Sequence, residues 1–229
     1  MKRQVICALL TLMILIPVSA QLKQGHLHYL AEISTEGKGS AETDMLAEMM
    51  NGSTMDIYFD ESRTRVDMAL GKGMFSSSSI VDTRSGKALM LMPSPILGKF
   101  AVRTTVEEIE KETAQAKSEE DRKIKLLDET REIAGYTCKK AVLTDMEGGQ
   151  ATFWYTEQIQ MITIGQSNLD DRIPGTSMEI ELLQNGMRLR YTVAEVSENL
   201  GKDPSNLFST EVPDGFQEMS MEDFKNLGN

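Results

Sequence analysis

Two histidines, His26 and His28, have the residue type and spacing that come closest to a metal site in this chain. They are the only histidines in the sequence, and residues two apart on a β-strand point to the same face. Imidazole nitrogens are common zinc ligands, so the pair would supply two-thirds of a zinc site if a carboxylate joined them. Histidines near the start of a chain are more often surface residues, and we therefore assign no metal and no cofactor to this protein.

Other polar groups that could do chemistry lack partners in the sequence. Residues 76–79 are four serines, but no histidine lies near them and no glycine pattern marks a nucleophile elbow. Asn168, Asp170 and Asp171 could collect calcium, but they lack the spacing and the terminal glutamate of a calcium-binding hand. We predict a non-enzymatic protein. An enzyme remains an alternative, because triads and metal sets also assemble from residues that are distant in the sequence.

Methionine is the unusual component of the composition, with 16 residues, many of them between positions 45 and 92. Three interpretations stay open: ordinary core, a pliable apolar ligand cavity, and a thioether site for cuprous ion. Met55, Met68, Met90 and Met92 alternate with other side chains on predicted strands. This alternation favours a single inward face over the clustered surface motifs of a metal carrier.

The first twenty residues have the pattern of a secretory signal peptide. Lys2 and Arg3 give a positive start, residues 5–18 are apolar, and residues 18–20 form a small-residue cleavage site. The apolar run is shorter than the ~20 residues of a transmembrane helix, and no later segment is apolar and long enough to cross a bilayer. We expect a cleaved signal over residues 1–20, a single domain over residues 21–229, and export to the periplasm, with an extracellular location as the alternative.

Charge and cysteine content limit the partners and the means of stabilisation. The formal net charge of −11 argues against nucleic acid and anionic lipid headgroups as non-specific partners. After cleavage only Cys138 would remain, so no disulfide can form within the chain, and we predict a buried, unreactive thiol.

Period-two alternation broken by turn dipeptides predicts a series of β-hairpins. The clearest covers residues 178–193, where Asn185-Gly186 separates two alternating runs. Counting outward from this turn predicts the facing pairs Leu182–Leu189, Ile180–Tyr191, Met178–Val193, Glu181–Arg190 and Glu179–Thr192. Three more hairpins are predicted over residues 55–70, 77–92 and 137–156. In the last of these, a turn at Gly148-Gly149 would place Leu143 opposite Trp154 and Val142 opposite Tyr155.

Helical spacing interrupts the β pattern in a few places. Residues 41–50 carry apolar side chains at helical spacing before a stop signal, and residues 105–108 form a capping box that opens a charged helix to about residue 121. Asp203-Pro204 predicts another helix start, and Met221, Phe224 and Leu227 predict a final helical turn.

Several short segments appear in a familiar order: residues 133–141 (IAGYTCKKA), 153–156 (FWYT), 173–175 (IPG), 207–208 (LF) and 212–216 (VPDGF). In these segments the chain resembles exported bacterial proteins of the domain of unknown function 4412 family, and its early hairpin with Arg63 and Arg65 also looks like that family's opening region. The family is similar to periplasmic lipoprotein carriers, whose curved, unclosed antiparallel barrel holds acyl chains under a helical lid. The resemblance implies this fold and suggests a ligand. The methionine-rich segment around residues 45–50 is a departure from the family pattern.

We therefore expect a mainly β protein with a few helices, in which a curved antiparallel sheet forms an unclosed half-barrel and helices cover its concave face. The predicted function is a binding protein that shelters a lipid or the acyl chains of a lipoprotein in that concavity. The alternative is a cell-envelope structural or interaction protein whose interior is packed and whose charged helix over residues 105–121 contacts a protein partner. The candidate ligand-binding residues are a helical lid and three wall positions: Met45, Leu46, Met49, Met50, Met55, Met68 and Trp154.

Overall fold

The computed structural model describes residues 21–35, 41–94, 98–119, 123–144, 149–162, 164, 172–184 and 186–226. The signal peptide predicted over residues 1–20 lies outside these ranges, as do Asn168, Asp170 and Asp171. None of the helices within these ranges is both long and apolar enough to span a bilayer.

The described chain forms twelve strands and four short helices. In chain order they are β1 (Gly25–Thr35), α1 (Ala41–Met50), β2 (Thr54–Phe59), β3 (Arg63–Leu70), β4 (Phe75–Asp82), β5 (Lys87–Ser94), β6 (Gly98–Thr105), α2 (Val106–Glu119), β7 (Lys123–Ile133), β8 (Tyr136–Thr144), β9 (Gln150–Thr156), β10 (Thr176–Gln184), β11 (Met187–Ser197), α3 (Pro204–Leu207), β12 (Gln217–Ser220) and α4 (Met221–Asn226).

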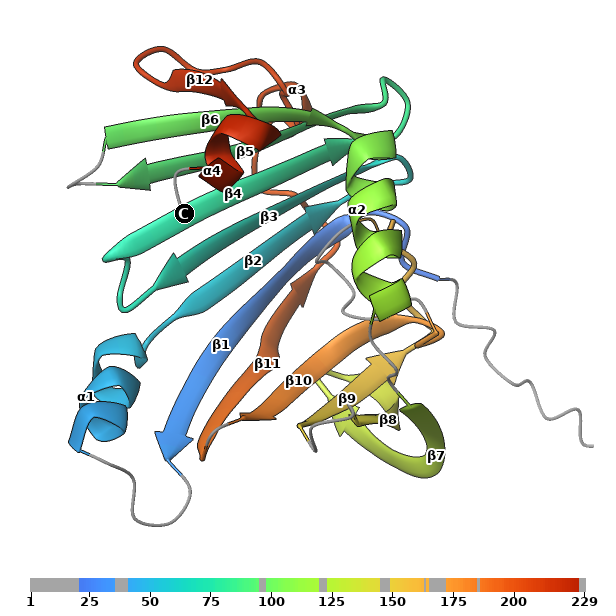
Figure 1. Cartoon of the computed structure of the whole chain (residues 1–229). Coiled ribbons are helices and arrows are strands. Elements are labelled where there is room, and N and C mark those ends of the chain that lie inside the picture. The colour runs from blue at the N-terminus through green and yellow to red at the C-terminus, as the bar shows by residue number, and fades with distance from the viewer. Residues whose placement is uncertain are drawn as a thin grey trace, which may run out of the picture.

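One open sheet contains all of these strands, in the order β12-β6-β5-β4-β3-β2-β1-β11-β10-β9-β8-β7. Strands β2 to β6 form one meander and β7 to β11 form another, and β1 joins them by pairing with β2 and with β11. Neighbouring strands are antiparallel, except that β12 pairs with β6 in parallel. Figure 1 shows that the sheet twists and curls along this order without closing. The expected half-barrel is confirmed.

Alternation along β1 defines the two faces of the sheet. Leu27, Tyr29 and Ile33 are buried, whereas His26 and His28 between them are only partly buried. We call the face that carries Leu27 and Tyr29 the inner face, and the face that carries the histidines the outer face. Register extends this assignment across the sheet, because directly paired residues point to the same side.

The predicted hairpins match the structure, with one correction in register. Four of the five predicted β10–β11 pairs are present, among them Leu182 opposite Leu189 and Glu181 opposite Arg190; the regular pairing ends at Glu179 opposite Thr192, before Met178 and Val193. On the outer face Glu181 accepts hydrogen bonds from Arg190 at 2.9 Å and from Arg188 at 3.1 Å. Burial works to raise the pKa of Glu181, but these arginines outweigh it and hold the pKa below its ordinary value.

The predicted register of β8 and β9 is wrong. Leu143 lies opposite Ala151 and Val142 lies opposite Thr152, so Trp154 instead faces Lys140. The pairing begins with Thr144 opposite Gln150. The connection between these two residues is longer than the two-residue turn predicted at Gly148-Gly149. Because the length of a hairpin connection sets the register, the predicted pairs are displaced.

The predicted helices are present. In the capping box of α2, the Thr105 amide donates to Glu108 Oε2 at 2.9 Å and the Glu108 amide donates to Thr105 Oγ1 at 3.2 Å. Asp203 caps α3 by accepting from the Ser205 amide at 2.9 Å. Figure 1 shows α2 and α4 on one side of the sheet and α1 beyond the ends of β1 and β2.

The largest core cluster lies around the central strands β1, β2 and β11. It includes Leu27, Ile57 and Val193, and it contains Tyr29, whose hydroxyl donates a hydrogen bond to the Ser177 carbonyl oxygen at 2.8 Å. Cys138 belongs to the same cluster and is a free, buried cysteine, as predicted. Burial raises the pKa of its thiol to about 11, which keeps it protonated and unreactive near neutral pH.

Residues 200–216 cover part of the outer face of the first meander. Leu200, Leu207 and Phe208 pack on Tyr58, and further along Val212 and Phe216 pack against a cluster of buried side chains on β4, β5 and β6. The outer face of these strands is therefore filled by the chain itself, while much of their inner face remains half-buried.

Candidate functional site

Methionines line the inner face of the first meander. Register places Met55 opposite Met68, Met90 opposite Val102, and Met92 opposite Phe100. All four methionines and Phe100 are only partly buried. Nearer to α2, inner-face residues such as Val81 and Ala88 are buried. This part of the sheet therefore presents an apolar surface that the described residues cover incompletely.

An exposed apolar patch lies at the other end of the sheet, on α1 and the β3–β4 turn (Figure 1). In α1 only Ala47 is buried, whereas Met45, Leu46 and Met49 are 73%, 40% and 43% exposed. The turn between β3 and β4 adds the exposed Met74 and Phe75.

The helix and the β3–β4 turn touch at Gly71. A Cβ atom built there would lie 2.8 Å from the Met49 carbonyl oxygen and 3.7 Å from the Cβ of Met74. Phe75 pairs with Leu70, which shares the inner face with Met68. We call the combined surface the methionine band; its members are Met45, Leu46, Met49, Met55, Met68, Leu70, Met74, Phe75, Met90 and Met92.

The structure thus brings together most of the predicted ligand-binding residues. Met50 is partly buried at the end of α1, next to its exposed neighbours. Trp154 lies apart from the band: its ring is covered by the Arg131 guanidinium at 4.1 Å and approached by the Lys140 ammonium at 5.6 Å. The assignment of Trp154 to a ligand wall stays a prediction, as does the role of α1 as a lid.

A second group of functional residue types lies on the outer face of β1 and β2. His26 Nε2 is 2.7 Å and His28 Nδ1 is 2.8 Å from the same oxygen, Oδ1 of Asp56. The three donor atoms all lie within 4.8 Å of one another. Asp56 is the carboxylate that the histidine pair lacks in the sequence.

Neighbouring residues fix this cluster and its charge. The His26 ring stacks on Tyr58 with centroids 4.3 Å apart and planes at 6°, and the Lys202 ammonium lies 4.6 Å from the centre of the Tyr58 ring. Partial burial works to raise the pKa of Asp56, but the hydrogen bonds and charges of His28 and His26 outweigh it, so the pKa lies below its ordinary value. Asp56 is therefore ionised near neutral pH.

Sequence reasoning could place His26 and His28 on one face but could not find Asp56. Alternation in β2 does indicate that Asp56 points away from Met55 and Ile57. The register of β1 against β2, which puts His28 opposite Asp56, spans residues 36–53 and is set by no short turn. No sequence rule fixes that pairing.

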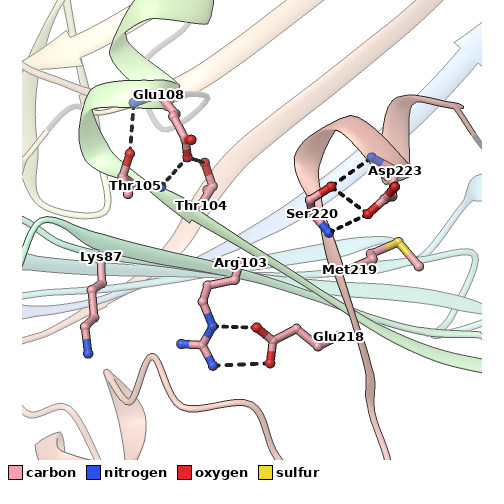
Figure 2. Close-up of a pocket in the computed structure, with 9 residues that line it drawn as sticks. All are labelled: Lys87, Arg103, Thr104, Thr105, Glu108, Glu218, Met219, Ser220 and Asp223. Atoms are coloured by element: carbon pink, nitrogen blue, oxygen red, sulfur yellow. Dashed lines mark hydrogen bonds and ion pairs between the residues drawn. The ribbon is translucent and has the colours of Figure 1, made fainter.

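A polar groove of about 530 Å³ lies where β6 meets β12, α2 and α4 (Figure 2). Arg103 Nε donates to Glu218 Oε1 at 2.8 Å, Thr104 Oγ1 donates to Glu108 at 2.8 Å, and Ser220 Oγ donates to Asp223 at 2.7 Å. These charged groups are satisfied by one another. We interpret the groove as the junction that holds β12 on β6, and it contains none of the predicted ligand-binding residues.

The family model of the domain of unknown function DUF4412 matches residues 38–196, which is most of the chain. The chain belongs to the DUF4412 family. None of the curated proteins matches it.

Solved structures resemble this DUF4412 protein at low sequence identity. A structure of PNGF-II has a TM-score of 0.53 at 17% identity and covers 90% of this chain, but this chain spans only 33% of that one. The complex of Pseudomonas aeruginosa MucA and MucB has a TM-score of 0.42 at 13% identity, with 85% of this chain and 57% of that chain covered. The Mycobacterium tuberculosis lipoprotein LppX has a TM-score of 0.36 at 9% identity, with 78% and 89% covered. At these identities, the PNGF-II match shows the fold alone.

Proposed function

We propose that this protein is an exported, non-enzymatic binding protein that shelters an apolar molecule, such as a lipid or a lipoprotein's acyl chains, against the methionine band. The observation that carries the proposal is the number of incompletely covered apolar side chains on one part of the molecule: α1 and the β3–β4 turn expose theirs, and the inner face carries four half-buried methionines. On that face Ser77 and Ser79 of β4 lie between the β2–β3 methionines and those of β5. An export signal over residues 1–20 would bring the protein to the periplasm, where such cargo is found.

The composition of the band suits a flexible ligand. Large exposed apolar patches on soluble proteins mark interaction sites, and methionine side chains repack around irregular partners because they are unbranched and polarisable. Each methylene that such a ligand buries contributes about 0.8 kcal/mol, so a chain of ten buried methylenes would gain roughly 8 kcal/mol before the costs of binding. No catalytic residue is needed for this function.

The shape of the band favours an extended apolar chain over a flat partner. Its half-buried members, such as Met55 and Met90, lie on the sheet, and its exposed members, such as Met45 and Met74, lie at one end. A chain could enter at α1 and continue along the sheet. The charged helix α2 would be the contact in the alternative function, in which the protein binds another protein of the cell envelope.

Uptake of a fluorescent fatty acid by the processed protein tests the proposal, together with native mass spectrometry of protein purified from its own compartment. We expect a bound lipid in the native sample and saturable uptake by the delipidated protein. In the double variant Met49→Ser and Met74→Ser, the lost apolar area should weaken binding by about tenfold or more, since 1.4 kcal/mol corresponds to a factor of ten.

Leu126→Ser is the matched control, because Leu126 is a similarly exposed apolar residue on β7, at the opposite end of the sheet order. Its fatty-acid affinity should equal that of the unaltered protein. A native sample free of lipid, combined with no uptake of fatty acid, would overturn the lipid function and favour a protein partner.

A further inference from the structure

The outer-face cluster of His26, His28 and Asp56 lies on the side of the sheet opposite the methionine band. It consists of two imidazole nitrogens that converge on one carboxylate oxygen. We propose that these three residues bind a Zn²⁺-type divalent cation, a role independent of apolar ligand binding.

The two nitrogen–oxygen distances are close to those that a metal requires, and the two nitrogens lie within 4.8 Å of each other. Zinc binds histidine nitrogen and carboxylate oxygen at about 2.0–2.2 Å, which places the ligand atoms of a tetrahedral site roughly 3.3 Å apart. The two nitrogen–oxygen distances of 2.7 and 2.8 Å are shorter than this by about half an ångström. A small retreat of the Asp56 carboxylate would admit the ion, with each neutral imidazole carrying its single proton on its other nitrogen, Nδ1 of His26 and Nε2 of His28.

The cluster is positioned by the sheet and not by a loop. His26 and His28 occupy alternate positions on β1, the central strand, and Asp56 lies directly opposite His28 on β2. Stacking on Tyr58 holds the His26 ring in its orientation. Ligands on neighbouring strands move little, so most of the ordering cost of the site is met when the sheet folds.

The carboxylate next to Asp56 is already paired. Asp67 lies opposite Asp56 on β3 and accepts a hydrogen bond from Arg65 Nε at 2.8 Å. Asp67 therefore neutralises Arg65, which limits the repulsion of a cation at Asp56. Glu195, opposite His28 on β11, is a further carboxylate on this face, but Asp56 is the one that contacts both imidazoles.

The donor set selects the class of ion. Two nitrogens and one carboxylate oxygen suit zinc and other divalent transition metals such as iron(II), whereas calcium and magnesium prefer oxygen ligands and cuprous ion prefers thiolate or thioether sulfur. The side chains of the three residues are 21–31% exposed, so solvent can reach the site. Three protein ligands would leave the fourth tetrahedral position of the zinc ion to water.

The decisive experiment uses the processed, untagged chain, whose only histidines are His26 and His28. Long-range ¹H–¹⁵N spectra of the histidine rings are recorded as Zn²⁺ is added, and calorimetry gives the stoichiometry. We expect one Zn²⁺ per chain, no competition from Ca²⁺, and metal-induced shifts at Nε2 of His26 and Nδ1 of His28. No saturable binding, or shifts confined to the other ring nitrogens, would overturn the proposal.

Variants provide a second measurement. Asp56→Asn and His28→Ala should each weaken Zn²⁺ binding by at least about 100-fold, since changes even to residues that only support metal ligands cost 10–100-fold. Glu32→Gln is the control, because it removes one negative charge, as Asp56→Asn does, from the outer face of the sheet. The Glu32 side chain is 76% exposed, and its replacement should leave the Zn²⁺ affinity unchanged. Equal losses in Asp56→Asn and Glu32→Gln would show that Zn²⁺ follows the net charge of the protein and would contradict a built site.

Discussion

The ion pair between Arg131 and Glu179 gives a quantitative test of how this sheet is stabilised. Arg131 Nη2 lies 2.6 Å from Glu179 Oε1, and Thr192 Oγ1 donates to the other carboxylate oxygen at 3.0 Å. The pair is asymmetric, because the Glu179 side chain is 10% exposed and that of Arg131 is 38% exposed. The guanidinium also lies over the ring of Trp154.

This asymmetry predicts which single variant costs more. Arg131→Met leaves the buried Glu179 carboxylate without its counter-ion. For a fully buried pair, such a change lowers the free energy of unfolding by about 3–5 kcal/mol. Because Arg131 is partly exposed and water can replace it, we expect Arg131→Met to lower the free energy of unfolding by about 2 kcal/mol. This value includes roughly 0.5–1 kcal/mol for the lost cation–π contact with Trp154. Glu179→Met leaves only a cation that solvent can reach, and we expect about 1 kcal/mol.

Urea unfolding measures both free energies, followed by far-UV circular dichroism and by the fluorescence of Trp154, the single tryptophan. For a chain of this size, 2 kcal/mol corresponds to a decrease in Tm of roughly 4–8 °C. The double variant should cost clearly less than the sum of the two single variants, because removing both partners leaves no unpaired buried charge. The reasoning fails if Glu179→Met costs as much as Arg131→Met, or if the two costs are additive.

Three further predictions concern the backbone, a buried hydroxyl and pH. Tyr29→Phe should lower the free energy of unfolding by about 1–3 kcal/mol, because it removes the hydroxyl that donates to the buried Ser177 carbonyl oxygen. The control is Tyr191→Phe, which removes a hydroxyl with no hydrogen bond to the described residues. In the same urea titration it should change the free energy of unfolding by less than about 0.5 kcal/mol. In thermal melting, Gly175→Ala should lower the free energy of unfolding by at least about 1 kcal/mol more than Gly201→Ala does. Gly175 has φ +147°, and a Cβ there would lie 2.4 Å from a backbone oxygen of β9, whereas the space around Gly201 is open. The lowered pKa of Glu181 means that its ionised form stabilises the fold above the ordinary glutamate pKa of about 4.3, and that this stability is lost as the pH falls through the lower folded value. Glu181→Gln should therefore reduce the loss of stability between about pH 5 and pH 3, and an unchanged pH profile would show that its arginine contacts contribute nothing.

The sequence predicts this fold well where a short turn fixes the register. The β10–β11 hairpin follows the predicted pairing because two turn residues allow a single register that keeps Leu182 and Leu189 on the apolar face. The predicted register of the β8–β9 hairpin is wrong because the glycines at positions 148 and 149 do not mark the centre of the connection between the two strands. Strand β7 escaped prediction, since its side chains are mostly charged and exposed and give no alternation.

The candidate sites differ in how far sequence reasoning reaches. The methionine alternation predicts a shared face for Met55 and Met68 because both belong to one hairpin. The meeting of His28 and Asp56 depends on a pairing between strands separated by α1 and by residues outside the described ranges, which only the folded sheet determines. Likewise, nothing local indicates that β12 returns to pair with β6 in parallel.

The two edge strands of the sheet, β12 and β7, are the places where a strand of another molecule could add. An outermost strand invites addition of a strand from another molecule, the first step of aggregation. Strand β7 carries closely spaced charges at Lys123, Lys125, Asp128, Glu129, Arg131 and Glu132, and its counterpart β12 is short and followed at once by α4. Edge-to-edge association is therefore disfavoured at both margins of the sheet.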